Sequence, residues 1–296
     1  MRVALTGATG SVGPAVLERL LADGHEVTAL GRRPVAGAAF AEWDLAGRFC
    51  EEAAGRHPAA SALARADALV HLALAHLPGR YRGGEGDDPE GFLRLNLGGT
   101  LDLFEAAADV PRIVLLSTRA VYGAYPPGTL LTEEMTPRPD TLYGQVKAAA
   151  EDALTRRPGG VSLRATGVYG PERPGTAHKW RPLLDAFGRG ETVGPRVATE
   201  VHEADLAAAV ALALTLPDPP PLLNVSDIVL DRRDLLSAYA RIAHRDGLLP
   251  PPGDPATVSA MATDRIRAFG WRPRGIAGVE DVLRGMADGT RDHAGS

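Results

Sequence analysis

The sequence predicts an α/β fold in which a doubly wound parallel sheet is followed by a smaller mixed α/β part. Three observations predict it. Short apolar runs with β-branched residues alternate with helical patterns along the first half of the chain. The first run, residues 3–5, is followed at once by a glycine-rich turn and a helical pattern. The 296 residues, 45% of them hydrophobic, suffice for an ample core.

The turn after the first predicted strand carries Gly7, Gly10 and Gly13, ahead of a helix with Pro14 in its first turn. Strand, glycine turn and helix in succession form a dinucleotide-binding fingerprint of the Rossmann type. Gly7 would permit the sharp turn, Gly10 would let the backbone approach a pyrophosphate, and Gly13 would let helix and strand pack closely. The helix N-terminus would supply N–H groups to the phosphates. An ordinary glycine-rich turn is the alternative, which the flanking elements disfavour.

The residues after the second predicted strand, residues 25–30, indicate which cofactor is bound. NAD-binding enzymes usually carry an acidic residue here, which binds the ribose 2′-hydroxyl. This chain has Gly31, Arg32 and Arg33 instead, and arginine matches a phosphate with a planar, bidentate fork. The sequence therefore favours NADP(H) and leaves NAD(H) open. A solvated basic loop is the alternative interpretation of the two arginines.

The next elements continue the alternation. Residues 38–43 are predicted as the third strand, a weak helix follows to about residue 65, and residues 67–73 are the fourth strand. We interpret His71 on that strand as structural, because an acid–base histidine would need a partner that the sequence does not show. Residues 78–91 form an irregular segment, either a loop over the substrate or a surface loop without a role.

The fifth predicted strand, residues 112–116, delivers Ser117 and Thr118 at its C-terminal end. A later helix carries Tyr143 and Lys147, which are four residues apart and therefore on one helical face. Tyr-x-x-x-Lys occurs by chance in many helices. The glycine fingerprint and the strand-end hydroxyls make chance a poor explanation here.

A helix is predicted over residues 92–108, although it contains Asn96, Gly98 and Gly99. These residue types are unfavourable in a helix interior. We therefore expect a packing or water-holding reason for them and treat Asn96 as a support of the active site.

Together these motifs resemble the extended short-chain dehydrogenase/reductase family, which includes sugar-nucleotide epimerases, dehydratases and reductases. The resemblance rests on the G-x-x-G-x-x-G spacing, an Asp-Leu pair after the third strand, Asn-x-x-Gly-Thr, and Tyr-x-x-x-Lys twenty-five residues after Thr118. It is strong through Pro171 and diffuse after it. It implies a cofactor site formed by Gly7, Thr9, Gly10, Val12, Gly13, Arg32, Arg33, Asp44, Leu45, Leu72, Asn96 and Lys147.

Within that site the resemblance implies that Asp44 and Leu45 contact the adenine. Asp44 would accept a hydrogen bond from the adenine amino group, and Leu45 would pack on the ring. A simple turn aspartate is the alternative. The resemblance also implies a catalytic set of Thr118, Tyr143 and Lys147. Tyr143 would be the general acid–base, and the Lys147 ammonium would lower its pKa from the usual value of about 10. Lys147 would also hold the nicotinamide ribose, and Thr118 would orient the substrate oxygen.

Two departures from the family pattern narrow the activity. Dehydratase relatives follow the strand-end Thr with Asp-Glu, whereas this chain has Arg119 and Ala120, so a 4,6-dehydratase is disfavoured. Sugar-nucleotide enzymes tend to carry an arginine where this chain has Ala198 or Thr199, and the nearest arginine is Arg196. That weakens the case for a nucleotide-sugar substrate without excluding it.

The chain divides into a dinucleotide-binding Rossmann domain, residues 1–165, a mainly substrate-binding part, residues 166–288, and a tail, residues 289–296, expected to be disordered. In the second part a His-Lys-Trp-Arg cluster at residues 178–181 either clamps a phosphate or a ring, or caps a helix. A strand is predicted at residues 222–226.

Composition restricts the partners and the compartment. The net charge of −5 argues against general nucleic-acid or membrane-surface binding. A single cysteine, Cys50, fits a reducing compartment and is interpreted as an incidental thiol. No signal peptide and no apolar run long enough to span a membrane are recognised, so a cytoplasmic protein is expected. The histidines show no ligand spacing, so no metal is proposed, and a homodimer is left open.

The sequence thus predicts an NAD(P)-dependent oxidoreductase that reduces a ketone by hydride transfer, with a nucleotide-linked 4-keto sugar as one candidate substrate. An NAD-dependent sugar-nucleotide epimerase is the main alternative. A non-catalytic NADP-binding sensor is a third, which the complete set of Thr118, Tyr143 and Lys147 disfavours, since a sensor has no need of it.

Overall fold

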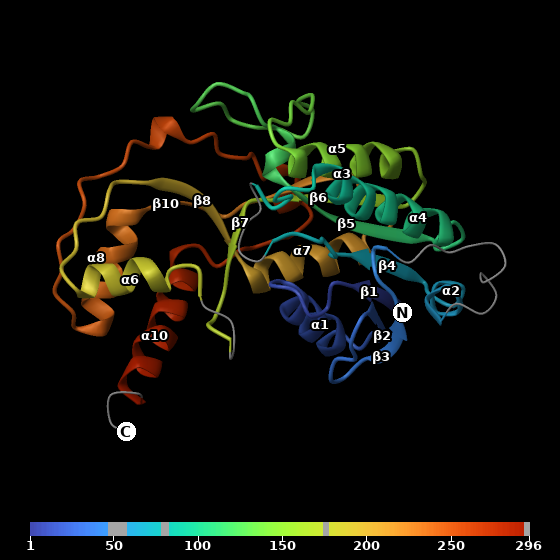
Figure 1. The fold of residues 1–296 in the computed structure, drawn as a ribbon, viewed down its shortest axis with the longest axis horizontal. Coiled ribbons are helices and arrows are strands. Elements are labelled where there is room, and N and C mark those ends of the chain that lie inside the picture. The colour runs from blue at the N-terminus through green and yellow to red at the C-terminus, as the bar shows by residue number, and fades with distance from the viewer. Residues whose placement is uncertain (47–57, 78–82, 174–177, 293–296) are drawn as a thin grey trace.

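A parallel sheet of seven strands, in the order β3-β2-β1-β4-β5-β6-β9, forms the centre of the protein in the computed structural model (Figure 1). The structure describes residues 1–46, 58–77, 83–173 and 178–292, and Cys50 lies outside these ranges. The expected doubly wound sheet is confirmed. Its strands are β1 (Arg2–Thr6), β2 (Glu26–Gly31), β3 (Ala39–Glu42), β4 (Ala68–His71), β5 (Arg112–Thr118), β6 (Gly160–Ala165) and β9 (Leu222–Val225).

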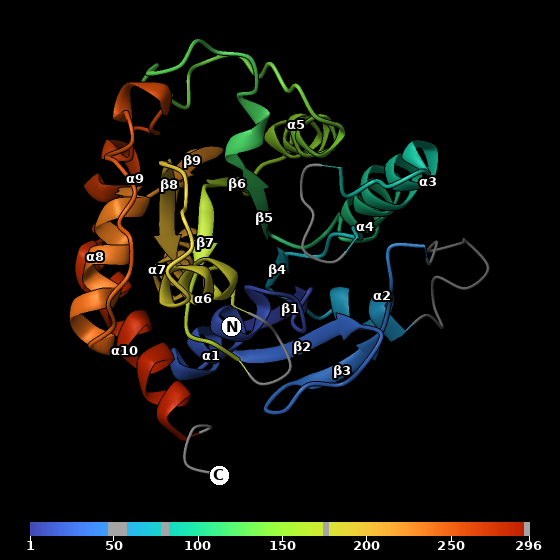
Figure 2. The ribbon, with the colours of Figure 1, turned by 60° about the vertical axis from the view of Figure 1, so that its left-hand side comes forward.

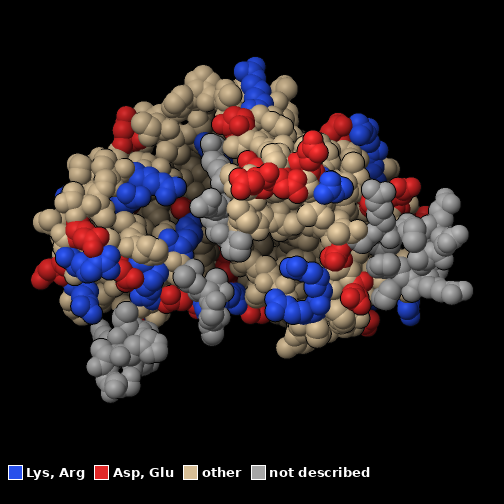
Figure 3. Space-filling view, viewed as in Figure 1, with Lys and Arg blue, Asp and Glu red and all other residues tan. Residues whose placement is uncertain are grey.

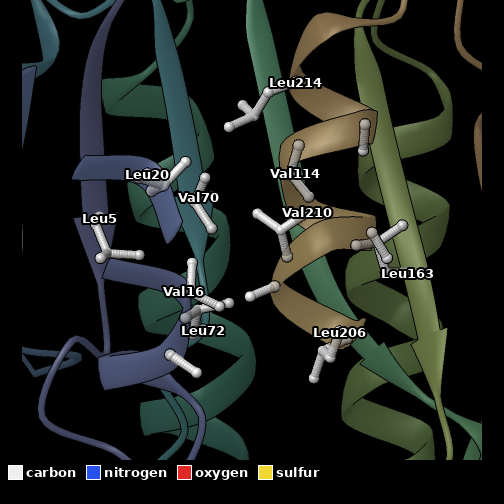
Figure 4. Packing of buried hydrophobic residues seen from close by; sticks show 14 of the residues in the cluster. Leu5, Val16, Leu20, Val70, Leu72, Val114, Leu163, Leu206, Val210 and Leu214 are labelled. Carbon is white, nitrogen blue, oxygen red and sulfur yellow. The ribbon is translucent and has the colours of Figure 1, made fainter. Parts of the chain in front are cut away.

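Helices cover both faces of this sheet. One face is packed by α1 (Gly13–Ala22), α7 (Glu203–Thr215) and α9 (Asp264–Ala268), and the other by α2 (Pro58–Leu63), α4 (Gly99–Ala106) and α5 (Leu142–Thr155). Burying each large aliphatic side chain contributes about 1.5–3 kcal/mol. Figure 4 shows the first of these layers, in which strand residues meet residues of α1 and α7: Leu5, Val70, Val114 and Leu163 against Val16, Leu20, Leu206, Val210 and Leu214.

A second, smaller part contains a three-stranded sheet in the order β10-β8-β7. All three strands are labelled in Figure 1, and Figure 2 shows β8 and β7 side by side. Here β7 (Gly167–Tyr169) runs parallel to β8 (Val197–His202), and β10 (Ile228–Asp231) is antiparallel to β8. The helices α6 (Arg181–Gly188), α8 (Arg232–Ala243) and α10 (Ile276–Asp292) pack around a core rich in Leu, Val and aromatic residues. The mixed α/β character of this part agrees with the sequence, although β8 and β10 were not predicted.

The boundary between the two parts is less simple than a cut at residue 165. That residue does end β6, but β9 and α7 come from later in the chain and belong to the large sheet. At the other end of the chain, α10 continues to Asp292, past the expected start of a disordered tail at residue 289. Residues 293–296 lie outside the described ranges.

The predicted helix over residues 92–108 is interrupted. It consists of α3 (Pro89–Leu93), a π-helical turn (Arg94–Gly98) and then α4. Such wide turns commonly mark functional positions, and Asn96 lies inside this one. Two short 3₁₀ turns, Arg119–Val121 and Pro255–Thr257, complete the regular elements.

The face of the molecule seen in Figure 3 carries charges of both signs. In Figure 3 acidic and basic side chains are interspersed, so the net charge of −5 is not gathered into one patch in this view. Among the helices of the described residues, none is both long and apolar enough to cross a membrane.

Candidate active site

The candidate residues meet at one edge of the large sheet, where its parallel strands end. Thr6 on β1 is level with Leu30 on β2 and with His71 on β4. Thr118 on β5 is level with Ala165 on β6. This is the edge at which open α/β sheets bind ligands, so the glycine turn, the Arg32-Arg33 pair and Thr118 share one ligand-facing side.

The geometry of the glycine turn agrees with the demands that the sequence placed on it. Gly7 has φ +72°, and an added Cβ would lie 2.8 Å from the amide nitrogen of Ala73. At Gly13 a Cβ would lie 2.2 Å from the carbonyl oxygen of Gly7. Gly10 lies at the exposed tip of the turn, and its N–H donates to the Gly7 carbonyl at 2.9 Å. Close packing therefore requires Gly7 and Gly13, whereas a Cβ at Gly10 would meet the Gly7 carbonyl oxygen at 3.2 Å, a milder contact.

The first turn of α1 is suited to an anion. No side chain caps it, because Val12 stands at the N-cap position, and Pro14 lacks an N–H. The helix dipole and the uncapped N–H groups favour negative charge at this end. Thr9 is exposed beside Gly10, and Val12 is half-buried.

On the β2–β3 side of the edge the predicted residues are exposed. Arg32 and Arg33 follow β2, and neither forms an ion pair with another described residue. Asp44 is exposed too, and its Oδ1 accepts from the Ala46 amide at 2.8 Å, as a turn aspartate does. The contacts predicted with the 2′-phosphate and the adenine stay predictions.

Leu45 is half-buried against the apolar layer beneath α4. Its carbonyl oxygen lies only 2.2 Å from where a Cβ of Gly99 would be. Gly99 is thus required for the close approach of α4 to the residue after Asp44. In the sequence Gly99 stands out as a poor helix former and as the glycine of Asn-x-x-Gly-Thr, but this packing contact was not predicted.

His71 is fully buried in a closed hydrogen-bond network. Its Nδ1 lies 2.8 Å from the Thr6 hydroxyl, and its Nε2 lies 2.9 Å from the Thr100 hydroxyl. The Thr100 hydroxyl donates to the Asn96 carbonyl at 2.6 Å, so it accepts from Nε2–H, which leaves Nδ1 to accept from Thr6. Burial, with a smaller contribution from Lys147, lowers the pKa of His71 to about 3. His71 is therefore neutral and structural, as predicted.

Thr6 and Leu72 connect this network to the glycine turn. The Thr6 hydroxyl accepts from the backbone amides of Leu72 and Ala73 at 3.2 and 3.3 Å. Ala73 is the residue that Gly7 abuts, and Leu72 is buried in the core beneath the turn. The cofactor contact predicted for Leu72 stays a prediction.

Asn96 is 1% exposed and holds the segment that follows β4. Its Oδ1 accepts from the Ala75 amide at 2.7 Å, and its Nδ2 donates to the Ala75 carbonyl at 2.8 Å. Nδ2 also donates to the Phe92 carbonyl at 3.0 Å. These bonds give Asn96 a supporting role for the backbone of the segment that follows β4, and its predicted contribution to the cofactor site stays a prediction.

Ser117 and Thr118 face opposite sides of β5, because successive strand residues alternate. Ser117 is buried and donates to Glu151 on α5. Thr118 is 9% exposed, and its Oγ1 accepts from the Ala120 amide at 3.2 Å. Of the two strand-end residues, Ser117 is thus engaged by α5, while Thr118 is the last residue of β5.

Tyr143 and Lys147 lie on α5, whose N-cap Thr141 accepts from the Gly144 amide at 3.1 Å. Gly144 brings this helix against the turn after Thr118, since a Cβ there would lie 2.6 Å from the Ala120 carbonyl oxygen. Tyr143 is half-buried beside that contact. Gly144 is a requirement that the sequence analysis missed, although its place inside Tyr-x-x-x-Lys was the available signal.

Lys147 is 5% exposed and donates from Nζ to the Leu116 carbonyl at 2.8 Å. Burial lowers the pKa of Lys147 to about 8, and the Glu151 carboxylate one turn on raises it in part. At neutral pH Lys147 is therefore mostly protonated. The ammonium that the proposed chemistry needs is present in its buried position.

A buried ion pair lies beneath the catalytic helix. Arg164 on β6 donates to both carboxylate oxygens of Glu151, with its Nη2 at 2.7 Å from Oε2. Arg164 is directly paired with Ser117 across β5 and β6, so all three side chains meet. The guanidinium also lies 4.7 Å from the ring centre of Tyr122, whose hydroxyl donates to Asn224 on β9. This pair, absent from the predicted site, ties α5 to three strands.

The cluster at residues 178–181 is mainly structural. His178 accepts from the Trp180 amide and bonds the Gly170 carbonyl, so it caps the turn into α6. Trp180 is buried and stacks on Tyr169, and Arg181 pairs with Glu172. Lys179 pairs with Glu200 on β8. In the part of the chain that the structure describes, no three side chains gather as metal ligands.

Comparison with known proteins adds family evidence. The model of the NAD dependent epimerase/dehydratase family matches residues 3–225. The chain is 30% identical to a dTDP-6-deoxy-L-talose 4-dehydrogenase (NAD(P)(+)) of Kitasatospora kifunensis, over 92% of this chain and 91% of that protein. It is 30% identical to a UDP-glucose 4-epimerase of Streptomyces lividans, over 91% and 90%. Its fold is similar to the UDP-glucose 4-epimerase of Thermus thermophilus in complex with NAD, at a TM-score of 0.75 and 29% identity, covering 96% and 99%.

Proposed function

The chain belongs to the NAD-dependent epimerase/dehydratase family of extended short-chain dehydrogenases/reductases, and we propose that it uses NADPH to reduce a ketone to an alcohol. It is an NAD(P)-dependent enzyme of oxidoreductase type. Nucleotide-linked 4-keto sugars are the first candidate substrates, because relatives that span the chain are named for dTDP- and UDP-sugars.

The fit of a dinucleotide is supported by the chain itself. Gly7 and Gly13 allow the turn, α1 begins without a side-chain cap, and the exposed Gly10 leaves the backbone approachable. These features would hold the pyrophosphate. The exposed guanidinium groups of Arg32 and Arg33, with no carboxylate at the end of β2, support NADP(H) over NAD(H).

A reduced nicotinamide, when bound at this edge, would supply the hydride that the carbonyl carbon needs. Tyr143 donates the phenolic proton to the carbonyl oxygen, and Thr118 holds that oxygen through its hydroxyl. The Lys147 ammonium favours the phenolate that remains and holds the ribose beside it. General acid–base catalysis of this kind typically contributes about 10²–10⁴-fold.

One observation carries the proposal above the others. The Gly144–Ala120 contact sets the start of α5 against the residue whose amide binds Thr118, while Lys147 is buried one turn further along and protonated at neutral pH. These contacts hold the backbone of α5 against the end of β5, which supports a shared role for Tyr143, Lys147 and Thr118. This arrangement supports hydride chemistry with protonation of an oxygen.

The alternative is an epimerase, which oxidises and re-reduces one substrate and so profits from retaining its cofactor. Both reactions begin with the same hydride and proton transfer. The exposed arginine pair favours the reductase, because NADPH is a common source of reducing equivalents and a net reductase exchanges its cofactor at each turnover.

The test is to incubate the purified protein with NADPH and candidate 4-keto sugar nucleotides or other ketones, following the absorbance of the reduced nicotinamide. Stoichiometric loss of NADPH with formation of the alcohol is expected. Conversion of an alcohol to its epimer without added cofactor and without net change in the nicotinamide would establish the epimerase instead.

A further inference from the structure

A cavity of about 180 Å³ lies beside the turn that follows Thr118, and none of the roles above uses it. Its wall is formed by the turn after β5, including Arg119, Ala120 and Tyr125, and by Thr257 and Ser259 from a distant segment. At roughly 30 Å³ per water molecule, it has room for about six waters. It can therefore receive a polar substituent of a substrate, although not a whole nucleotide.

Ala120 connects this cavity to the reacting groups. Its amide donates to the Thr118 hydroxyl at 3.2 Å, and its carbonyl oxygen abuts Gly144, next to Tyr143. Ala120 is also part of the cavity wall. A substituent in the cavity would therefore belong to the part of the substrate close to its reacting carbon.

Arg119 is held rigidly in that wall. Its Nε and Nη2 donate to the Ser259 carbonyl at 3.1 and 2.9 Å. The segment that carries Ser259 is itself anchored, because the Ser259 hydroxyl donates to Pro126 and Met261 bridges to Leu131. A guanidinium fixed in this way loses little further conformational freedom when it binds a ligand.

The charge in the wall has one sign. Among the cavity-lining residues that the structure describes, Arg119 is the one charged at neutral pH. Arg138 adds positive charge nearby, with its guanidinium 4.6 Å from the ring centre of Tyr125. Arginine recognises carboxylate and phosphate oxygens with matched geometry.

We propose that Arg119 and this cavity form a subsite for an anionic substituent, a carboxylate or a phosphate, carried by the substrate next to its reacting carbon. The proposal rests on the proposed function, since it assumes that the reacting carbon lies at Thr118 and Tyr143. It narrows the substrate class to acidic sugars or comparable anionic ketones and alcohols. Arg119 is then a determinant of specificity.

The test compares matched probes that differ in one substituent, measured by calorimetry or ligand-observed NMR on the NADP⁺-loaded protein. The difference in affinity between UDP-glucuronate and UDP-glucose measures recognition of a carboxylate. The difference between glucose 6-phosphate and glucose measures recognition of a phosphate. The wild type is expected to prefer the anionic member of at least one pair. Arg119→Gln should weaken the binding of that anionic member by about 10- to 100-fold and leave the affinity for the neutral member unchanged.

Two further variants keep the result interpretable. Arg119→Lys retains the charge without the planar fork and should restore binding in part. Arg65→Gln removes an exposed arginine at the opposite edge of the sheet, so it controls for net charge. Bound NADP⁺ and the unfolding temperature report on folding in each variant.

Three outcomes would overturn the proposed anion subsite. The wild type could bind both members of each pair equally well, the preference for the anionic member could survive Arg119→Gln, or no probe could bind at all. None of these outcomes bears on ketone reduction, which NADPH consumption tests separately. Loss of NADPH consumption with an intact anion preference would refute the proposed function alone.

Discussion

The two sides of the ligand-facing edge are built differently. On the β4–β5–β6 side the polar side chains are buried and bonded to protein: His71 is 0% exposed, Asn96 1% and Lys147 5%. On the β2–β3 side Arg32, Arg33 and Asp44 are exposed. Protein hydrogen bonds fix the side chains of the first side when the chain folds, whereas the exposed side chains of the second would be fixed when a ligand binds. Changes on the first should therefore alter stability as well as rate, and changes on the second should alter binding alone.

The largest effect is expected for the proposed proton donor on the buried side. Tyr143→Phe keeps the ring and removes the transferable proton, so turnover should fall by about 10²–10⁴-fold. Cofactor affinity, measured by calorimetry, should persist. Tyr239→Phe, in the core of the second part, is the matched control and should leave turnover unchanged. Near-normal turnover of Tyr143→Phe would refute the assignment.

The buried ion pair provides the next test. Glu151→Gln leaves the Arg164 guanidinium without its charged partner, which should lower the free energy of unfolding by about 3–5 kcal/mol. The adjacent Asp152→Asn removes an exposed pair with Arg156 and should cost less than about 1 kcal/mol. Urea unfolding measures both. Equal effects of the two variants would show that the buried side is not held together by this pair.

The neutral His71 predicts a pH dependence. Its pKa is about 3 in the folded protein and about 6.5 when unfolded. Between these values the unfolded chain binds the extra proton, so stability is lost as the pH falls below 6.5. From pH 6.5 to 4.5 the loss from this group should be about 2 kcal/mol. His71→Gln, which does not titrate, should show a correspondingly smaller loss in urea unfolding, and an unchanged loss would contradict a neutral His71.

The smallest effect is expected on the exposed side. The double change Arg32→Ala and Arg33→Ala should weaken NADPH binding by about 10- to 100-fold and leave NADH binding nearly unchanged. The urea midpoint should not move, since both side chains are exposed. Calorimetry that shows tighter NADH than NADPH binding to the wild type would contradict both the cofactor proposal and this half of the comparison.

The sequence predicted well those features that local pattern controls. The strand, glycine turn and helix at the N-terminus require Gly7 and Gly13 for steric reasons that are visible in the spacing alone. Strand-end positions and the helix that carries Tyr-x-x-x-Lys likewise follow from periodicity, and Thr118 ends β5 while Lys147 lies on α5. The burial of Lys147 was not predicted.

Features that depend on long-range pairing were missed. Ser117, Glu151 and Arg164 meet because β5 and β6 pair in one register, which no local pattern specifies. The available signal was an arginine inside a short, mainly apolar predicted strand, and the structure buries every residue of that strand. The strands β8 and β10 were missed for the same reason, since the pairing of β8 with β10 and with β7 becomes visible only once the chain is folded.

The place of β9 in the sheet has a consequence for synthesis. Residues 222–225 form β9, which pairs with the outer edge of β6. That edge of β6 therefore stays unpaired until Val225 has left the ribosome. An open edge strand is a template for wrong pairing and aggregation. The nascent cofactor-binding half therefore has to wait for a piece of the other half, and a fragment truncated after residue 165 should be recovered as aggregate.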